Sequence, residues 1–224
     1  NYSKSIQWFE KIDRNALTAK EESEYQFKLG YAYIEAKEFK KAKPLFAILK
    51  NGDSEYKEPS TYYFAYLSYL DKEYKTALAE FEKLKGSKAY ETSYPYYISA
   101  LYFLDKRYDD VLAYAIPILN NSKQQFETEM FRIVAASYFA KSDFKNASAY
   151  YQKFQQKDLG KTQNNQDSYQ IGYTALRLND HKKAIEELEK MSTPDEFYQS
   201  GMIVLGEALL YAKNKQAARN TFFR

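Results

Sequence analysis

Side chains that could do acid–base or metal chemistry are scarce in this chain. It has 224 residues with one histidine, His181, and no cysteine. An enzyme active site needs a nucleophile, a base and a group that orients them, and zinc sites are built largely from several His or Cys ligands. A single histidine supplies neither set, and the lack of cysteine also excludes disulfides and thiol catalysis. We therefore expect no enzymatic activity, no metal site and no cofactor.

Two further stretches have polar side chains at suggestive spacing. The run AIEELEK, residues 184–190, puts carboxylates at helical spacing, which is typical of a solvated helix face with Lys partners four residues away. The run KGSK, residues 85–88, lacks the spacing and the strand context of a phosphate-binding loop. His181 stands where other parts of the chain have Tyr or Phe, so we expect its ring to pack at the start of a helix.

The composition predicts a helical protein. Hydrophobic residues make up 45% of the chain, while it has only 7 Gly and 5 Pro, which favours long helices with short joints. Charged residues nearly cancel to a net charge of +3, too small and too mixed for a nucleic-acid or anionic membrane surface. No apolar run is long enough to cross a bilayer. The start, NYSKSIQWFE, has neither an initiator methionine nor a signal peptide, so we expect a piece of a longer protein.

Small residues recur along the chain at a nearly fixed period. Most lie three residues after an aromatic residue, and their successive spacings are 37, 35, 34, 36, 37 and 34 residues; they are Ser5, Ala42, Ala77, Val111, Ala147, Ala184 and Ala218. From Ala42 onward, a second small residue stands twelve positions earlier: Gly30, Ala65, Ser99, Ala135, Gly172 and Gly206. A large residue usually follows four positions later: Phe9, Phe46, Phe81, Tyr151, Leu188 and Phe222, with Ala115 as the exception.

These columns resemble the tetratricopeptide repeat, in which a pair of antiparallel helices recurs about every 34 residues. The resemblance implies an all-α fold, a right-handed α-α superhelix formed by a single array over residues 1–224. Residues 1–13 are expected to be the second helix of a truncated repeat, and 199–224 a truncated final repeat. The full repeats are expected at 23–57, 58–91, 92–127, 128–164 and 165–198.

The packing expected from these columns is close contact between helices. We expect the small residue of the first helix to face the small residue of the second, with large side chains filling the space toward the next pair. In the segment YYFAYLSYLDKEY, residues 62–74, Phe64 and Ala65 are then the core of the first helix, and Tyr63 lies beside an exposed tyrosine stripe.

The first helices carry a second stripe, with the spacing i, i+4, i+7, roughly opposite the core. In tetratricopeptide repeats these columns line a concave groove, so the resemblance implies a peptide-binding surface here. We call the candidates the inner-face residues: Phe27, Tyr31, Tyr62, Tyr66, Tyr69, Tyr96, Phe103, Arg132, Phe139, Tyr169, Tyr173 and Arg177.

Two interpretations of the inner-face residues stay open, and they are compatible. The rings can pack between neighbouring first helices, or they can bind a peptide segment with rigid, amphipathic contacts. Glu24, Glu35, Glu129 and Glu207 outnumber Arg132 and Arg177 on this face, which argues against a phosphate backbone as ligand. The Lys and Asn clamp by which some members of the family hold carboxylate-terminated tails is absent, whereas a glycan ligand stays possible.

The chain is thus expected to be a non-catalytic scaffold or adaptor for another protein or peptide segment. It could also be the recruiting module of a larger protein that has its activity elsewhere, or it could self-associate through the apolar ends of the array. Segments such as YAIPIL, residues 114–119, look like the long repeat proteins of Bacteroidetes cell envelopes. That resemblance implies a periplasm-facing protein, with a cytoplasmic one as the alternative. The partner, the compartment and the oligomeric state do not follow from the sequence.

Overall fold

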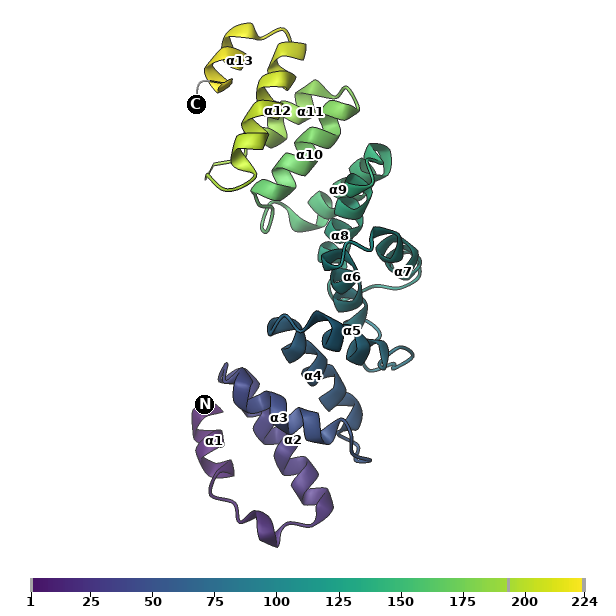
Figure 1. Cartoon of the computed structure of the whole chain (residues 1–224), viewed down its shortest axis with the longest axis vertical. Coiled ribbons are helices and arrows are strands. Elements are labelled where there is room, and N and C mark those ends of the chain that lie inside the picture. The colour runs from purple at the N-terminus through teal and green to yellow at the C-terminus, as the bar shows by residue number, and fades with distance from the viewer. Residues whose placement is uncertain (1, 193, 223–224) are drawn as a thin grey trace. The chain divides into compact units, whose positions relative to one another are not determined.

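The computed structural model describes residues 2–192 and 194–222, and helix is the only regular secondary structure in these residues. It contains thirteen α-helices, one short 3-10 helix and no strand within that range (Figure 1). The all-α repeat fold of antiparallel helix pairs is confirmed. No helix in the described part of the chain is both long and apolar enough to span a membrane.

The chain divides into two compact units, residues 1–101 and 102–224. Unit 1 begins with a lone helix and a 3-10 turn, followed by two helix pairs. Its elements are α1 (Tyr2–Phe9), η1 (Arg14–Ala16), α2 (Ala19–Glu35), α3 (Phe39–Leu49), α4 (Lys57–Leu70) and α5 (Tyr74–Glu82). Helix α6 (Tyr94–Leu104) runs across the division between the units. Helix α2 begins ahead of residue 23, at the N-cap Thr18, whose capping box with Glu21 satisfies the first free N–H groups.

Unit 2 continues with the same alternation of helices. Its elements are α7 (Tyr108–Asn121), α8 (Glu127–Ala140), α9 (Phe144–Asp158), α10 (Asn165–Arg177), α11 (His181–Leu188), α12 (Tyr198–Tyr211) and α13 (Lys215–Phe222). Each helix from α8 onward packs against its neighbour in the chain, and α12 also packs against α10. The repeat boundaries given above stay a prediction, since the helices do not by themselves fix where one repeat ends.

The turns inside the helix pairs share one backbone geometry. Each has three residues, and the middle one has a positive φ between 58° and 62°: Lys37, Lys72, Lys106, Ser142, Asn179 and Lys213. In the α4–α5 turn, the Lys72 N–H donates to the Tyr69 carbonyl (3.0 Å) and the Glu73 N–H to the Ser68 carbonyl (2.9 Å). These two bonds are a Schellman motif, which satisfies helix carbonyls and reverses the chain. The left-handed residue is not glycine in any of these six turns.

Glycines on the first helices lie against a large side chain of the second helix. A Cβ built on Gly30 would come within 2.9 Å of the Phe46 ring. One on Gly172 would come within 2.5 Å of Leu188 Cγ. The expected small-to-small contact stays a prediction, since these distances do not test it. In each case the large side chain comes from the second helix, four positions after that helix's own small residue. The glycine leaves room for this side chain, which fills the core of the pair.

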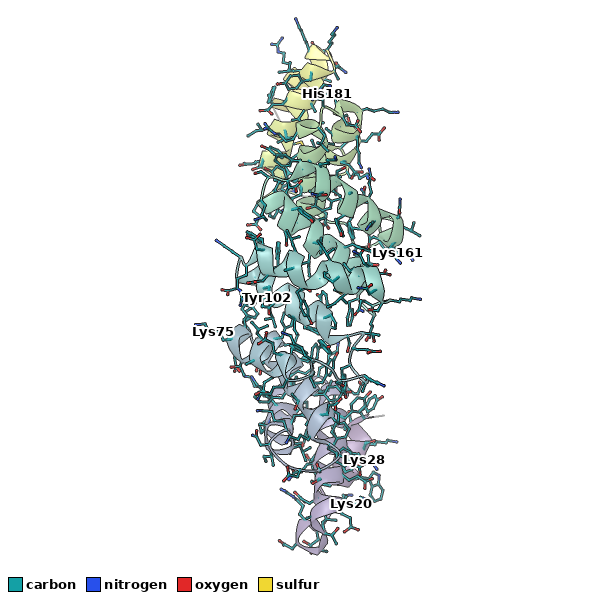
Figure 2. All side chains as sticks on the ribbon, turned by 90° about the vertical axis from the view of Figure 1, so that its right-hand side faces the viewer. Lys20, Lys28, Lys75, Tyr102, Lys161 and His181 are labelled. Atoms are coloured by element: carbon teal, nitrogen blue, oxygen red, sulfur yellow. The ribbon has the colours of Figure 1, made fainter. Side chains whose placement is uncertain are left out.

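Polar ladders join successive second helices on the outer side. In unit 1 the Lys50 ammonium contacts the Glu80 carboxylate at 2.8 Å, and in unit 2 the Gln155 amide donates to Glu187 at 2.9 Å. Burial by itself raises the pKa of Glu80, but hydrogen bonds from Lys50 and Lys83 outweigh it, so the pKa lies below its ordinary value. Other lysines, such as Lys75 and Lys161, are exposed and project from the ribbon (Figure 2).

Candidate functional site

Six of the inner-face residues form a patch in unit 1, which we call the unit 1 patch: Phe27, Tyr31, Tyr62, Tyr66, Tyr69 and Tyr96. Helices α2, α4 and α6 position them, because residues spaced i, i+4, i+7 share one side of a helix. Tyr31 is the most exposed, at 38%, and the other five are half-buried. The patch thus offers ring edges to a partner while part of every ring is already in contact with the protein.

Aromatic residues just before α4 and α6 cover part of this patch. Tyr56, at the N-cap of α4, stacks on Phe27 with ring centroids 4.9 Å apart. Tyr90, before α6, stacks on Tyr62 at 4.6 Å. Sequence reasoning missed this column, although its signal is present: each of these rings stands seven residues before another tyrosine.

Those second tyrosines, Tyr63 and Tyr97, are the centres of the ring packing. Tyr97 is only 7% exposed, stacks on Phe81 at 4.8 Å and receives the edges of Tyr66 and Tyr69 at 5.9 and 5.6 Å. Tyr63 stacks on Phe46 at 5.1 Å. Tyr63 thus lies beside the tyrosine stripe, 5.6 Å from the Tyr62 ring, and also packs on the core ring of Phe46. Tyr63 and Tyr97 each stand one position after an inner-face residue. At that position the side chain lies on the side of the first helix that contacts the preceding helix pair.

Burial in this cluster suppresses tyrosine ionisation. Desolvation raises the pKa of Tyr63 to about 12 and that of Tyr90 to about 12. Burial also raises the pKa of Tyr62, although hydrogen bonds to Ser93 and Tyr97 act against the shift. At neutral pH these hydroxyls are protonated, so they are hydrogen-bond donors as well as acceptors.

The remaining six inner-face residues form the unit 2 patch: Phe103, Arg132, Phe139, Tyr169, Tyr173 and Arg177. Phe139 contacts Tyr173 edge-on at 5.7 Å and Tyr169 at 6.3 Å, so rings of α8 and α10 meet as the packing interpretation expects. Phe103 lies apart from these rings, against Tyr108 at 5.6 Å. Contacts between rings of neighbouring first helices thus occur in both units, whereas ligand binding by them stays a prediction.

The two arginines of the unit 2 patch differ in what they contact. Arg132 lies over the Phe154 ring, donates to the Thr162 carbonyl at 3.2 Å and faces the Asp167 carboxylate at 3.6 Å. Asp167 is buried, and burial raises its pKa although the Arg132 charge lowers it in part. The Arg132 guanidinium therefore holds the loop before α10 in place and is already engaged.

Arg177, in contrast, is exposed and has no ion pair among the residues that the structure describes. Its guanidinium lies over the Phe144 ring, 5.6 Å from the centroid. It lines a pocket of about 290 Å³ together with Tyr173, Leu176, Asn179, His181, Glu207 and Tyr211. Two inner-face residues thus meet in this pocket, the Tyr173 ring and the Arg177 cation, and together they can bind a polar group.

Chemistry beyond binding has no assembled site in the described residues. They contain no group of three or more His, Asp or Glu side chains arranged to hold a metal ion. The His181 ring stacks on Tyr211 with centroids 5.2 Å apart and an interplanar angle of 8°, as a packing residue does. Glu24, on the inner side of α2, is paired with Lys28 at 2.5 Å.

The paired helices have the fold of tetratricopeptide repeat proteins, as the similar solved structures show. A crystal structure of the C-terminal part of such a repeat-containing protein from Cytophaga hutchinsonii is similar, with a TM-score of 0.68 and 13% identity over 100% of this chain and 90% of that one. It supports the resemblance to repeat proteins of the Bacteroidetes.

Two further solved structures are similar in fold. PilF of Pseudomonas aeruginosa has a TM-score of 0.66 and 12% identity, covering 91% of this chain and 90% of that one. YrrB, described as a tetratricopeptide repeat protein with an unusual peptide-binding site, has a TM-score of 0.60 and 15% identity, covering 96% and 97%. No family model matches this chain, and no curated protein does.

Proposed function

We propose that this chain is a non-catalytic interaction module that binds a peptide or protein segment on its tyrosine-rich inner face. The observation that carries the proposal is the partial burial of the unit 1 patch. Tyr31 and Tyr66 keep accessible ring surface although their neighbours fix them in place. A ring that is held by packing loses little conformational freedom when a partner covers it, so its contact area contributes to affinity at low entropic cost.

The unit 2 patch supports the same function with a polar contact. Arg177 and Glu207 line one pocket beside the Tyr173 ring, and neither has an ion pair among the described residues. A bound segment can satisfy such charges with its own side chains or backbone, which adds specificity to the apolar contacts. The similarity to YrrB agrees with peptide binding, and a peptide site in that protein is the reason to test for one here.

The proposed setting is the cell envelope, facing the periplasm, either as an independent adaptor or as the recruiting part of a larger envelope protein. The similarity in fold to PilF, which is an envelope-related protein, agrees with this setting. A glycan is the second candidate ligand, since tyrosine rings also stack on sugars. The unit 1 patch favours it more than the unit 2 patch does, because five of its six residues are tyrosines, whose rings combine apolar faces with hydroxyls.

The test starts from peptide selection on the 224-residue chain with a random peptide library displayed on phage. Selected peptides are then titrated against variants by fluorescence anisotropy. Replacing both Tyr31 and Tyr66 by Ser should weaken binding by about 2 kcal/mol or more, as for hot-spot rings, since these two contact fewer rings than Tyr62 does. Tyr31→Phe with Tyr66→Phe should retain most of the affinity because the rings remain.

A control is Trp8→Ser, since Trp8 is 72% exposed on α1 and is not an inner-face residue. It should bind the selected peptides as the parent chain does. Unchanged affinity in the Tyr31→Ser, Tyr66→Ser variant would contradict the assignment of the site. If no peptide is selected while soluble sugars quench tyrosine fluorescence in a saturable way, the glycan interpretation replaces the peptide one.

A further inference from the structure

The pocket of about 290 Å³ between α10 and α12 of unit 2 has opposite charges on its two walls. Helix α10 contributes Tyr173 and Arg177 to it, and α12 contributes Glu207 and Tyr211. The two residues of each helix are spaced i, i+4, so their side chains share one side of that helix. The pocket therefore lies between two consecutive first helices, and both of its walls belong to the part of the chain that the structure describes.

The two charged residues depart from the pattern of their repeat columns. At the column of Glu207, the other first helices have tyrosine or alanine: Tyr31, Tyr66, Ala100, Ala136 and Tyr173. At the column of Arg177, they have mostly uncharged residues: Glu35, Leu70, Leu104, Ala140 and Tyr211. No other pair of neighbouring first helices places opposite charges at these two columns. The packing of neighbouring first helices therefore does not require them.

The two charges line one pocket without pairing with each other. Arg177 and Glu207 are both exposed, and neither has an ion pair among the described residues. The Arg177 guanidinium lies instead over the Phe144 ring of α9, 5.6 Å from its centroid. A guanidinium and a carboxylate arranged in this way can each contact the opposite charge of a bound molecule, and such charged hydrogen bonds are the stronger ones.

The other lining residues give the two walls different chemistry. On the α10 side, the Tyr173 hydroxyl and the Asn179 amide can donate hydrogen bonds to the same carboxylate as Arg177. On the α12 side, the Tyr211 ring stacks on His181 with centroids 5.2 Å apart, so it is held in place although it is 65% exposed. An aromatic face near a carboxylate attracts a cation. The α10 wall thus suits an anionic group and the α12 wall a cationic one.

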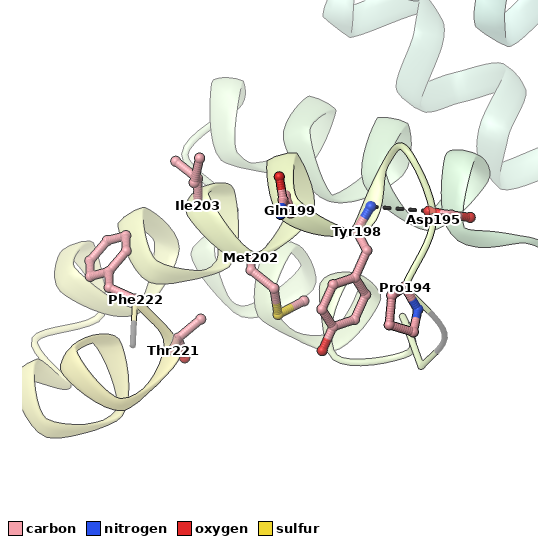
Figure 3. A pocket seen from close by; sticks show the side chains of 8 residues that line it. All are labelled: Pro194, Asp195, Tyr198, Gln199, Met202, Ile203, Thr221 and Phe222. Atoms are coloured by element: carbon pink, nitrogen blue, oxygen red, sulfur yellow. Dashed lines mark hydrogen bonds between the residues drawn. The ribbon is translucent and has the colours of Figure 1, made fainter. Parts of the chain in front are cut away.

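The volume of the pocket limits what can enter it. Pockets that enclose a complete small ligand usually measure about 300–1,000 Å³, so this one, at about 290 Å³, suits the ends of one or two side chains. A larger cavity of about 460 Å³, between α12 and α13, differs in chemistry (Figure 3). Among the described residues that line it, Asp195 alone is charged, and its carboxylate already accepts the Tyr198 N–H.

We propose that the pocket between α10 and α12 binds a protein segment that carries an acidic and a basic side chain a few residues apart. The acidic side chain accepts hydrogen bonds from the Arg177 guanidinium, and the basic one contacts the Glu207 carboxylate and the Tyr211 ring. A segment with both charges complements the pocket, whereas a lone anion would be repelled by Glu207. The pocket thereby sets the chemistry of the segment that the inner face binds, and this role rests on the function proposed above.

Peptides for this pocket can be selected separately from those that need the unit 1 patch. The random phage library is applied to the 224-residue chain with Tyr31→Ser and Tyr66→Ser, and the selected peptides should share an acidic and a basic residue. The tightest of them is titrated with the parent chain by fluorescence anisotropy. Replacing its acidic residue by the corresponding amide, or its basic residue by Gln, should each weaken binding about fivefold, as for a charged contact at a partly exposed site.

Variants of the chain identify which charges meet. Arg177→Gln should weaken binding about fivefold, and combining it with the change of the peptide's acidic residue should cause little further loss, because both changes remove one contact. Glu207→Gln should behave in the same way with the peptide's basic residue. Arg219→Gln and Glu196→Gln are the matched controls, since both residues are exposed and neither lines the pocket. They should leave the affinity unchanged, and circular dichroism verifies that all variants are folded.

Losses that simply add in both combinations would overturn the proposal, because the charges of the pocket would then not meet those of the peptide. Tighter binding by the Glu207→Gln chain would also overturn it, since the pocket would then take an anion alone. If the parent chain selects peptides that need Tyr31 and Tyr66 while the doubly substituted chain selects none, the function proposed above stands and only the charge-paired segment is wrong. If neither chain selects a peptide, both proposals are wrong.

Discussion

At the scale of single residues, the same amino acid has different roles at adjacent positions. Tyr62 lies on the inner face, whereas Tyr63 stacks on Phe46 as part of the core. Arg132 and Arg177 were both candidates for ligand contact. The structure ties Arg132 to Thr162 and Asp167 and leaves Arg177 exposed over Phe144. Side-chain chemistry alone does not separate these cases, because neighbouring helices decide which groups are already satisfied.

The turn lysines are a residue-scale feature with a direct consequence for stability. Lys72 has φ 62°, a conformation that costs an L-residue about 1 kcal/mol and costs glycine little. Lys72→Gly should therefore raise the free energy of unfolding by about 0.5–1 kcal/mol, although the more flexible unfolded chain offsets part of the gain. Urea unfolding followed by circular dichroism measures it.

The control for this prediction places glycine nearby in a regular helix. Ala79 is exposed inside α5, so Ala79→Gly should lower the free energy of unfolding by about 1 kcal/mol. The two substitutions introduce the same residue with opposite expected signs. If Lys72→Gly destabilises the chain as Ala79→Gly does, the left-handed geometry of the turn is not a source of strain.

At the scale of elements, contact between successive helix pairs is made by stacked rings in unit 1 and by a mixture of rings, amides and an ion pair in unit 2. Tyr97 joins α4, α5 and α6 through Tyr66, Phe81 and its own helix. In unit 2 the corresponding position is Gln170, which bonds the Tyr151 hydroxyl. The same repeat positions therefore join successive helix pairs in both units, while the types of side chain at those positions differ.

The ring stack predicts a loss of stability in alkaline solution. Burial raises the pKa of Tyr63 and Tyr90 to about 12, while an unfolded chain releases these protons near about pH 10. Their contribution to the free energy of unfolding is thus fully present below about pH 10 and is lost as the pH rises toward 12. The loss should not exceed about 1 kcal/mol per tyrosine at about pH 11, since solvent screens these half-buried groups.

Urea unfolding at about pH 8 and about pH 11 measures this loss. Tyr63→Phe keeps the ring and removes the ionising hydroxyl, so its free energy of unfolding should fall less between the two conditions than that of the parent chain. Tyr2→Phe, at an exposed position on α1, should fall as much as the parent chain. An equal decrease in all three proteins would show that the ring stack does not cause the alkaline sensitivity.

At the scale of the whole molecule, each unit has a core built from contacts between consecutive helices. In such repeat folds, stability is close to a sum over neighbouring elements, so a local defect weakens its own surroundings most. Phe46 in unit 1 and Phe154 in unit 2 are both 0% exposed. Replacing either by Leu should cost about 1–2 kcal/mol, because volume and ring contacts are lost.

Amide hydrogen exchange locates the damage from these two substitutions. Phe46→Leu should speed exchange mainly in α2, α3 and α4, while α10, α11 and α12 keep protection closer to that of the parent chain. Phe154→Leu should show the reverse pattern. Equal acceleration along the entire chain in both variants would indicate global cooperativity and would contradict the additive description.

The sequence by itself determined the class of fold and the register of its helices. The recurring small residues, from Ala42 to Ala218, and the scarcity of Gly and Pro suffice because period and chain breakers are local properties. The inner-face stripe on α4 also follows from helical spacing alone. The absence of a catalytic set was expected from the single histidine and the missing cysteines.

Tertiary structure alone decided which side chains meet. Gly30 receives the Phe46 ring, Tyr97 is buried while the adjacent Tyr96 is half-exposed, and Arg132 is engaged while Arg177 is free. These outcomes depend on how a neighbouring helix is rotated and how closely it approaches, and no spacing within one helix contains that information.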